Sequence, residues 1–138
     1  MNSAKFTIEP LSNAGSHCFI DISINGVSAR FLIDTGASKT TIDSVFYETL
    51  GLKGAIVTDG IISTYSGEME TAVLETTIDI KIGSGVWANA EILIIPIDAI
   101  NQQYSYVGIA GVKGVLGNDF FIKGRCFIDY YFKTIYYS

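Results

Sequence analysis

The sequence predicts a mainly β fold with one or two short helices, and three observations support this prediction. The chain has 138 residues, enough for one domain with its own core and too few for two. Hydrophobic residues make up 49% of it and charged residues 17%, a balance that disordered chains do not have. Fourteen glycines separate runs rich in Ile, Val, Thr, Tyr and Phe, which is typical of strands joined by tight turns. We therefore expect a single domain over residues 1–138.

The first part of the chain predicts a hairpin. Lys5–Glu9 alternates weakly and is expected as a short strand, followed by turn-forming residues at Ser12–Ser16. In Cys18–Ile24 isoleucine recurs at every second position, which is the period of a strand with one buried face. Asn25-Gly26 is a strong hairpin signal, so Val27–Ile33 is expected to return antiparallel to the preceding strand.

The rest of the chain predicts further short strands and a brief helix. The helix is expected at Val45–Leu50, because Asp43 or Ser44 can cap its start and the glycine that follows can end it. Asp98–Gly111 is polar and is expected to be irregular. The other expected strands are Thr40–Ile42, Ile56–Ile62, Glu68–Ile82, Ala90–Ile97, Phe127–Tyr130 and Thr134–Tyr137.

The loop after the first hairpin carries the clearest chemical signal. Asp34 directly follows the apolar run Phe31-Leu32-Ile33, where an unpaired buried carboxylate would be costly without compensation. Gly36 lets the backbone turn tightly, and the small side chains of Ala37 and Ser38 leave the loop open. Asp-Thr-Gly also occurs in ordinary strand–turn segments, so the motif needs support from elsewhere in the chain.

Composition and missing motifs disfavour several function classes. The net charge is −5 without a cluster of Lys or Arg, which disfavours nucleic acid as a partner. No apolar run reaches the length of a membrane span, and the start lacks the blocks of a signal peptide, so a cytoplasmic protein is expected.

Known hydrolase motifs that use other side chains are also missing. The only histidine, His17, is expected to follow a turn, and neither Gly-x-Ser-x-Gly nor His-Glu-x-x-His occurs. Cys18 and Cys126 lack metal-ligand spacing and are expected as buried thiols. A hydrolase built on this sequence would therefore work with carboxylates, and we expect no metal and no other cofactor.

A second motif lies about eighty residues after the first. In Val115-Leu116-Gly117-Asn118-Asp119-Phe120 an apolar pair and a glycine lead into a short predicted helix. Together with Asp34-Thr35-Gly36-Ala37-Ser38, in this order, the motif resembles the retropepsin-like (retroviral-type) aspartic proteases, in their cellular or bacterial form. The resemblance covers essentially the whole chain and implies a single-lobe acid-protease β-barrel. Asp119 is interpreted as a structural acid near the helix start, where it favours the helix dipole.

The resemblance also assigns a role to a polar hairpin tip in the middle of the chain. Taken alone, this segment is typical of an ordinary surface hairpin. Its place some thirty residues after Asp34 matches the flap that closes over substrate in the family. The residues of the predicted flap are Thr64, Tyr65, Ser66 and Gly67.

The resemblance further implies a homodimer, because one chain carries one Asp-Thr-Gly. Two copies of Asp34 would share a proton and activate water to cleave a peptide or protein substrate. In the family, the residue at Thr35 hydrogen-bonds across the two-fold axis, and Gly36 allows close approach of the substrate. Val115 and Ala37 are expected as apolar pocket walls, with Lys113 at a pocket rim.

The chain ends and some loop residues bear on the expected dimer. In the family the chain ends help join the subunits, and Lys5–Glu9 and Thr134–Tyr137 have apolar patterns that would otherwise leave open edges. These two segments are therefore the expected dimer interface. Ser38 and Lys39 stand where retroviral enzymes usually have acids, and Asn118 where they have arginine. An ion pair known from those enzymes is therefore missing.

Two other functions remain open on the sequence. One is a catalytically silent dimeric peptide-binding or scaffolding domain of the same fold, although such a domain has no chemical need for an intact Asp34-Thr35-Gly36. The other is a carboxylate glycosidase, which would need two acids in one site of one chain.

Overall fold

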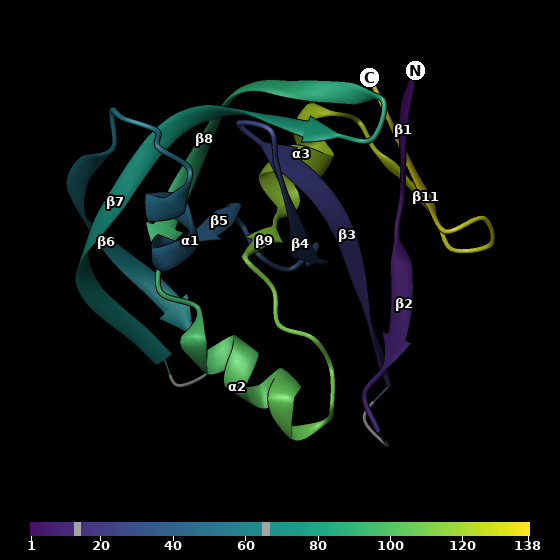
Figure 1. Ribbon diagram of the computed structural model, residues 1–138, viewed down its shortest axis with the longest axis horizontal. Helices are drawn as coiled ribbons and strands as arrows, with labels where there is room; N and C mark the ends of the chain where they lie inside the picture. Colours follow the sequence, from purple (N-terminus) through teal and green to yellow (C-terminus); the bar gives the residue numbers. More distant parts are fainter. Residues whose placement is uncertain (13–14, 65–66) are drawn as a thin grey trace.

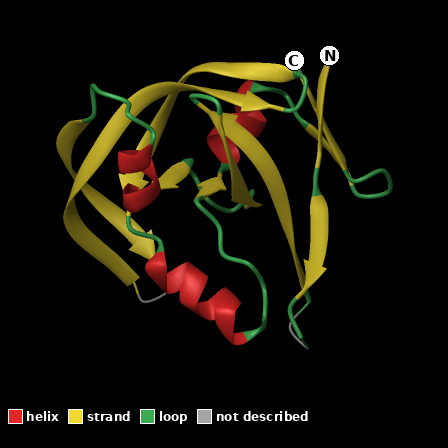
Figure 2. Cartoon of the chain, in the orientation of Figure 1, coloured by secondary structure: helices red, strands yellow, loops and turns green. Residues whose placement is uncertain are grey.

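The computed structural model describes residues 1–12, 15–64 and 67–138, with only the backbone of residues 58–64 and 67–73. Strands dominate the architecture, which confirms the mainly β prediction (Figures 1 and 2). The strands are Asn2–Lys5 (β1), Thr7–Pro10 (β2), Ser16–Ile24 (β3), Val27–Ile33 (β4), Thr41–Asp43 (β5), Ile56–Thr64 (β6), Gly67–Ile82 (β7), Gly85–Ile95 (β8), Gly114–Leu116 (β9), Phe127–Asp129 (β10) and Thr134–Tyr137 (β11). The helices are Ser44–Thr49 (α1), Asp98–Tyr106 (α2) and Asn118–Lys123 (α3).

Six of the strands close into a barrel in the order β3, β4, β9, β5, β8 and β7. Strand β7 pairs back to β3 through Ser23 and Lys81, and this contact closes the ring. Strands β2 and β6 extend the sheet beyond the barrel. Strand β9 lies parallel to β4, so the two sequence motifs, far apart in the chain, meet side by side inside the barrel. Closure leaves the barrel strands few unpaired backbone groups.

The predicted first hairpin is confirmed, and its register follows from its turn. Asn25 and Gly26 both have positive φ, 50° and 79°, as a two-residue turn that matches the strand twist requires. The pairing runs without a bulge from Ile24 opposite Val27 to Cys18 opposite Ile33. Each side chain of β4 therefore has a predictable neighbour on β3.

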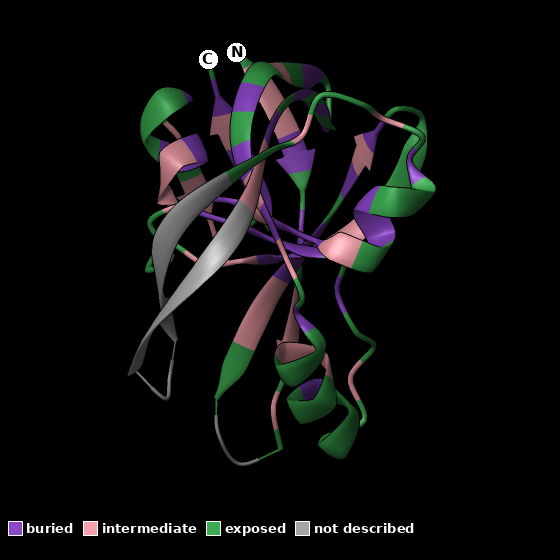
Figure 3. Ribbon diagram, turned by 90° about the vertical axis from the view of Figure 1, so that its left-hand side faces the viewer, coloured by how far each residue is buried: buried purple, intermediate pink, exposed green. Residues whose placement is uncertain are grey.

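The two faces of this hairpin pack against different apolar clusters. Ile20, Ile22 and Phe31 belong to the main core, where Phe31 has no exposed surface. The opposite face carries a second cluster: Phe19, Leu32, Ile97, Tyr104, Val112 and Val115. Figure 3 shows the buried residues gathered in the strands and the exposed residues on the outer sides of the helices. The hairpin is thus buried on both faces at the end that leads to Asp34, whereas nearer the turn its second face carries exposed Asp21 and Ser28.

Helix α1 forms as the sequence predicts, and helix α2 does not. Asp43 caps α1, because its carboxylate accepts a hydrogen bond from the N–H of Phe46 at 3.2 Å. Residues 98–106 form a helix, so the prediction that Asp98–Gly111 is irregular is wrong for most of that segment. Tyr104, on its inner side, is 4% exposed and anchors α2 in the second cluster. Among the described residues, none of the helices has the length and apolar character needed to cross a membrane.

The two chain ends pair within the chain. Strand β11 lies between β1 and β10, with Ala4 opposite Ile135 and Ile128 on the other side of Ile135. The prediction that Thr134–Tyr137 would leave an open edge is therefore wrong. The predicted first strand, Lys5–Glu9, is divided between β1 and β2, which belong to different sheets.

The two cysteines are free and only half-buried, so they are less enclosed than predicted. Cys126 packs against the main core, and burial raises the pKa of its thiol to about 11. The Cys18 thiol lies 3.8 Å from the hydroxyl of Tyr130, between β3 and the turn that follows β10.

Candidate active site

Asp34 lies at the end of β4 and is held by backbone hydrogen bonds. Its N–H donates to the carbonyl of Leu116 at 3.0 Å, which continues the β4–β9 pairing by one residue. The N–H of Gly36 donates to Asp34 Oδ1 at 2.9 Å, and the N–H of Ala37 donates to the Asp34 carbonyl at 3.1 Å. The carboxylate is half-buried, whereas Thr35 and Gly36 are exposed. The loop thus orients an acid that is still open to a ligand.

The second motif supports this loop from the neighbouring strand. The N–H of Asn118 donates to the carbonyl of Ala37 at 2.7 Å. A Cβ at Gly117 would lie 2.9 Å from that same carbonyl oxygen and 2.8 Å from the carbonyl carbon of Lys39. Only glycine allows this approach, which explains why a glycine follows the apolar pair.

Asp119 and buried Thr40 form a partly buried clamp that the sequence analysis missed. Both carboxylate oxygens of Asp119 accept from the N–H of Thr40 at 3.0 Å, and Oδ1 also accepts from the Thr40 hydroxyl at 2.7 Å. The Thr40 hydroxyl in turn accepts from the N–H of Gly117 at 3.0 Å. Asp119 is therefore structural, as predicted, but its main role is to tie the end of the Asp34 loop to the start of α3.

Removing this clamp should destabilise the protein. In Asp119→Ala the buried N–H and hydroxyl of Thr40 lose their acceptors, so we expect the free energy of unfolding to fall by about 2–3 kcal/mol. Urea unfolding followed by circular dichroism measures this loss. Glu48→Ala, at an exposed position of α1, is the control and should change stability by less than about 0.5 kcal/mol. Equal stability of the two variants would contradict the structural role of Asp119.

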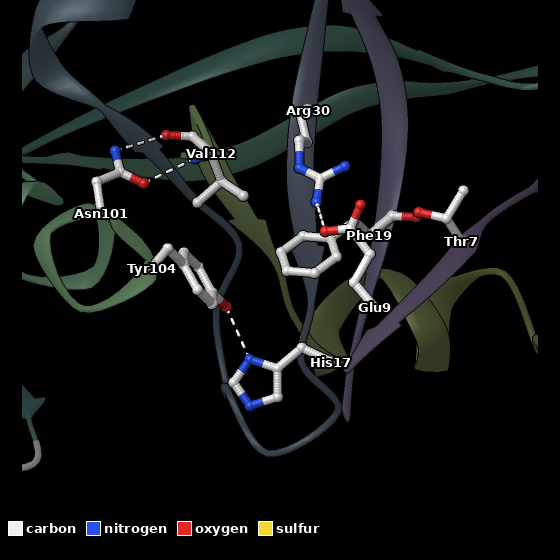
Figure 4. A network of polar contacts seen from close by, with 8 residues as sticks. All are labelled: Thr7, Glu9, His17, Phe19, Arg30, Asn101, Tyr104 and Val112. Atoms are coloured by element: carbon white, nitrogen blue, oxygen red, sulfur yellow. Dashed lines mark hydrogen bonds and ion pairs between the residues drawn. The ribbon is translucent and has the colours of Figure 1, made fainter. Parts of the chain in front are cut away.

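His17 is a second residue whose place near the site the sequence analysis missed. It follows the turn between β2 and β3, as expected, and lies in β3 opposite Glu9 of β2. Extending the β3–β4 register by one pair beyond Cys18 and Ile33 places His17 opposite Asp34. Its Nδ1 lies 2.8 Å from the hydroxyl of Tyr104 (Figure 4). The Asn25-Gly26 turn was the signal that could have found it, because counting back from that turn pairs residue 17 with residue 34.

The remaining predicted site residues lie on both sides of the Asp34 loop. Lys113 is exposed just before β9, whereas Val115 is only 6% exposed because the second cluster covers it. Ser38 is exposed, and the Lys39 ammonium lies 3.8 Å from the carboxylate of Glu91 in an exposed ion pair.

The predicted flap belongs to the long hairpin of β6 and β7. Thr64 is the last residue of β6 and Gly67 the first of β7, and these two residues pair with each other. Tyr65 and Ser66 lie outside the described residues. The backbone thus places the two described flap residues at the end of one hairpin.

Asp34 lines neither of two cavities formed by the described residues. These cavities, of about 360 and 330 Å³, are lined by other residues, the first by the 4–7 segment with Asp21 and Arg30, and the second by Lys39 with residues of β7 and β8. Within the described ranges, no group of three His, Cys, Asp or Glu side chains could hold a metal ion.

The barrel and the supported Asp34 loop define the fold of the retropepsin-like aspartic proteases. The sequence matches the family model described as aspartyl protease over residues 20–120, which include both motifs. The chain therefore belongs to the aspartyl protease family. The search of curated proteins finds no match to this sequence.

Two solved structures have a similar fold. A retropepsin-like aspartic protease from Rickettsia conorii is 19% identical, with a TM-score of 0.57 over 94% of this chain and 87% of that one. EIAV protease, solved in complex with the inhibitor HBY-793, is 21% identical, with a TM-score of 0.56 over 80% of this chain and 90% of the other. At these identities the likeness shows the fold alone.

Proposed function

We propose that this chain is one retropepsin-like domain over residues 1–138 and acts as an aspartic endopeptidase, with Asp34 as the catalytic acid and base. The observation that carries the proposal is the link between the two motifs. Asp34 N–H bonds to the Leu116 carbonyl, and Asn118 N–H bonds to the Ala37 carbonyl. Backbone hydrogen bonds, rather than contacts with flexible side chains, thereby hold the loop that carries this half-buried carboxylate at the end of a barrel strand.

The chemistry requires a second carboxylate, which a second copy of the chain supplies. Two carboxylates about 3 Å apart cannot both ionise, so they share one proton. The ionised group acts as general base on a water molecule, and the protonated group polarises the scissile carbonyl. One chain has one Asp-Thr-Gly, and its Asp34 loop is exposed at Thr35 and Gly36, where the loop of the second copy would meet it.

Substrate would lie extended between this floor and the flap. Main-chain hydrogen bonds would hold it, and its side chains would alternate between pockets on either side. Thr64, Tyr65, Ser66 and Gly67 would cover it, with Ala37 and Val115 beneath and Lys113 at the rim.

An exposed group of aromatic side chains is the surface on which we expect the two copies to meet. This aromatic turn consists of Phe127, Tyr130, Tyr131 and Phe132, which are 61–87% exposed. It lies at the Asp34 end of the first hairpin, because Tyr130 contacts Cys18 and Cys18 pairs with Ile33. In the described part of the chain, the adjacent β10 has a neighbour on one side only. Edge strands with apolar side chains tend to pair with another chain.

Substitution within the aromatic turn should weaken the dimer. In Tyr131→Asp a charge replaces a ring that is 87% exposed, so we expect the dimer dissociation constant to rise at least about tenfold. Sedimentation velocity over a concentration series measures it. Val45→Asp, at a 64% exposed apolar position of α1, is the matched control and should leave the constant unchanged. A dimer equally tight in both variants would place the interface elsewhere.

A peptide-library cleavage assay, with and without a transition-state inhibitor of aspartic proteases, tests the proposed function. Cleavage that the inhibitor blocks supports the proposal. Peptide binding without cleavage would instead favour the silent peptide-binding domain, and cleavage unaffected by the inhibitor would point to a contaminant or another mechanism.

A further inference from the structure

One face of the first hairpin leads directly to Asp34. Side chains alternate along a strand, so Asp34, which directly follows β4 and continues its pairing with β9, is expected on the same face as Leu32 of β4. Their cross-strand neighbours on this side are Phe19, which pairs with Leu32, and His17, which follows one step further. Along its other edge β4 pairs with β9, and there Val115 is the neighbour of Leu32. A ligand bound at Asp34 on this side would therefore meet these side chains.

Helix α2 covers this face. The ring of Tyr104 packs edge-to-face on Phe19 and on His17, with centroid distances of 5.4 and 5.8 Å. Its hydroxyl lies 2.8 Å from His17 Nδ1 (Figure 4). Under this cover Leu32 is 9% exposed and Val115 is 6% exposed. The side chains nearest to Asp34 on this face are thus already enclosed by the chain itself.

The cover is fixed in place from two directions. The Asn101 side chain accepts from the N–H of Val112 at 2.7 Å and donates to its carbonyl at 2.9 Å, which clips α2 to the segment before β9. On the other side, the Arg30 guanidinium stacks over the Phe19 ring at 3.9 Å and pairs with Glu9 (Figure 4). These contacts therefore hold in place the Phe19 ring, against which Tyr104 packs.

We propose that Tyr104, held by His17, closes the substrate pocket beside Asp34 and restricts it to small apolar side chains. This inference rests on the proposed function and names the substrate class of that site. The partly accessible residues that pack against this cluster are Leu11, Ala37, Ile95, Ile100 and Ile109, and of these Ala37 belongs to the Asp34 loop. All are apolar, so a polar or charged substrate side chain would lose its water without gaining a partner. Since Leu32 and Val115 present almost no surface, the pocket is shallow.

The test compares substrate preference before and after the cover is trimmed. A series of peptides carries Gly, Ala, Val, Leu or Phe at each of the two positions that flank the scissile bond. Wild-type protein should prefer Ala or Val, and Tyr104→Ala should raise the ratio of kcat/KM for Phe over Ala by about tenfold or more. Tyr106→Ala is the matched control, because Tyr106 lies on the same helix and is 79% exposed. Its preference should equal that of the wild type.

Two further measurements keep the outcome decisive. Tyr104→Leu keeps an apolar side chain of intermediate size, so it should shift the preference in the same direction if Tyr104→Ala does not fold. The same peptides, fluorescently labelled, are titrated into Asp34→Asn protein with and without Tyr104→Leu, which reports pocket size without cleavage. Cleavage with identical preferences in all folded variants would overturn the inference while leaving the proposed function intact. Neither cleavage nor peptide binding by any protein in the series would overturn both.

Discussion

Asp34→Asn protein is expected to fold like the wild type and to lose peptide cleavage by at least about a hundredfold, the usual contribution of a general acid–base group. The fold should survive because the asparagine side-chain oxygen can still accept from the N–H of Gly36, the hydrogen bond that orients the Asp34 side chain within the described part of the chain. Activity should be lost because an amide neither ionises nor shares a proton with the second carboxylate. The measurement is kcat/KM on a cleavable peptide, alongside a thermal unfolding curve.

The control for this variant is the same acid-to-amide change at an exposed position. Asp98→Asn, at the start of α2, should keep both the activity and the unfolding temperature of the wild type. Residual cleavage by Asp34→Asn within tenfold of the wild type would rule out Asp34 as the catalytic group. If Asp34→Asn loses its fold together with its activity, Asp34→Glu is measured instead. This variant keeps the negative charge but moves it, so it separates the structural role of Asp34 from its chemical role.

Wild-type activity is expected to be poisoned when excess Asp34→Asn protein is mixed in and allowed to exchange subunits. With about nine inactive chains for each active one, random pairing should lower the activity per wild-type chain roughly tenfold. The reason is that a heterodimer has only one usable carboxylate, and the mechanism needs two. Specific activity should also fall on dilution below the dimer dissociation constant.

The control in the mixing experiment is a chain that carries both Asp34→Asn and Tyr131→Asp. If the aromatic turn joins the copies, this double variant should pair poorly and should not poison the wild type. Undiminished activity with the single variant, after verified exchange, would mean that each chain works alone. Poisoning by the double variant would keep the dimer and reject the aromatic turn as its interface.

The parts of the site that depend on neighbours in sequence were predictable from the sequence. The Asn25-Gly26 turn sets the register of the first hairpin, and the apolar run before Asp34 places that residue at the end of a buried strand. The cap residue Asp43 and the glycine that follows the helix mark the two ends of α1 to within one residue. Even the position of His17 opposite Asp34 could have been counted from the turn. Each of these features involves residues within one hairpin or one helical turn, where local geometry leaves few alternatives.

The cover over the site was not predictable, because it depends on packing across the fold. Residues 98–106 are mostly polar and offer only Ile100 and Tyr104 as apolar residues one helical turn apart. The helix is secured by the ring of Tyr104 on Phe19 and by the two hydrogen bonds between Asn101 and Val112. The bond between Thr40 and Asp119 spans 79 residues, and β1 pairs with β11 across almost the whole chain.

The difference between the predictable and the unpredictable features depends on whether a contact is local or long-range in the sequence. The sequence by itself determined the hairpin, the Asp34 loop and the turn at Gly117 that leads into the short helix, because turn-forming residues and strand periodicity can be recognised from adjacent residues. Only the tertiary structure decided that α2 forms over the face beside Asp34, that Thr40 is buried against Asp119, and that β11 is enclosed by β1 and β10. These contacts join segments whose own periodicity is weak, so their free energy arises only when distant elements are brought together.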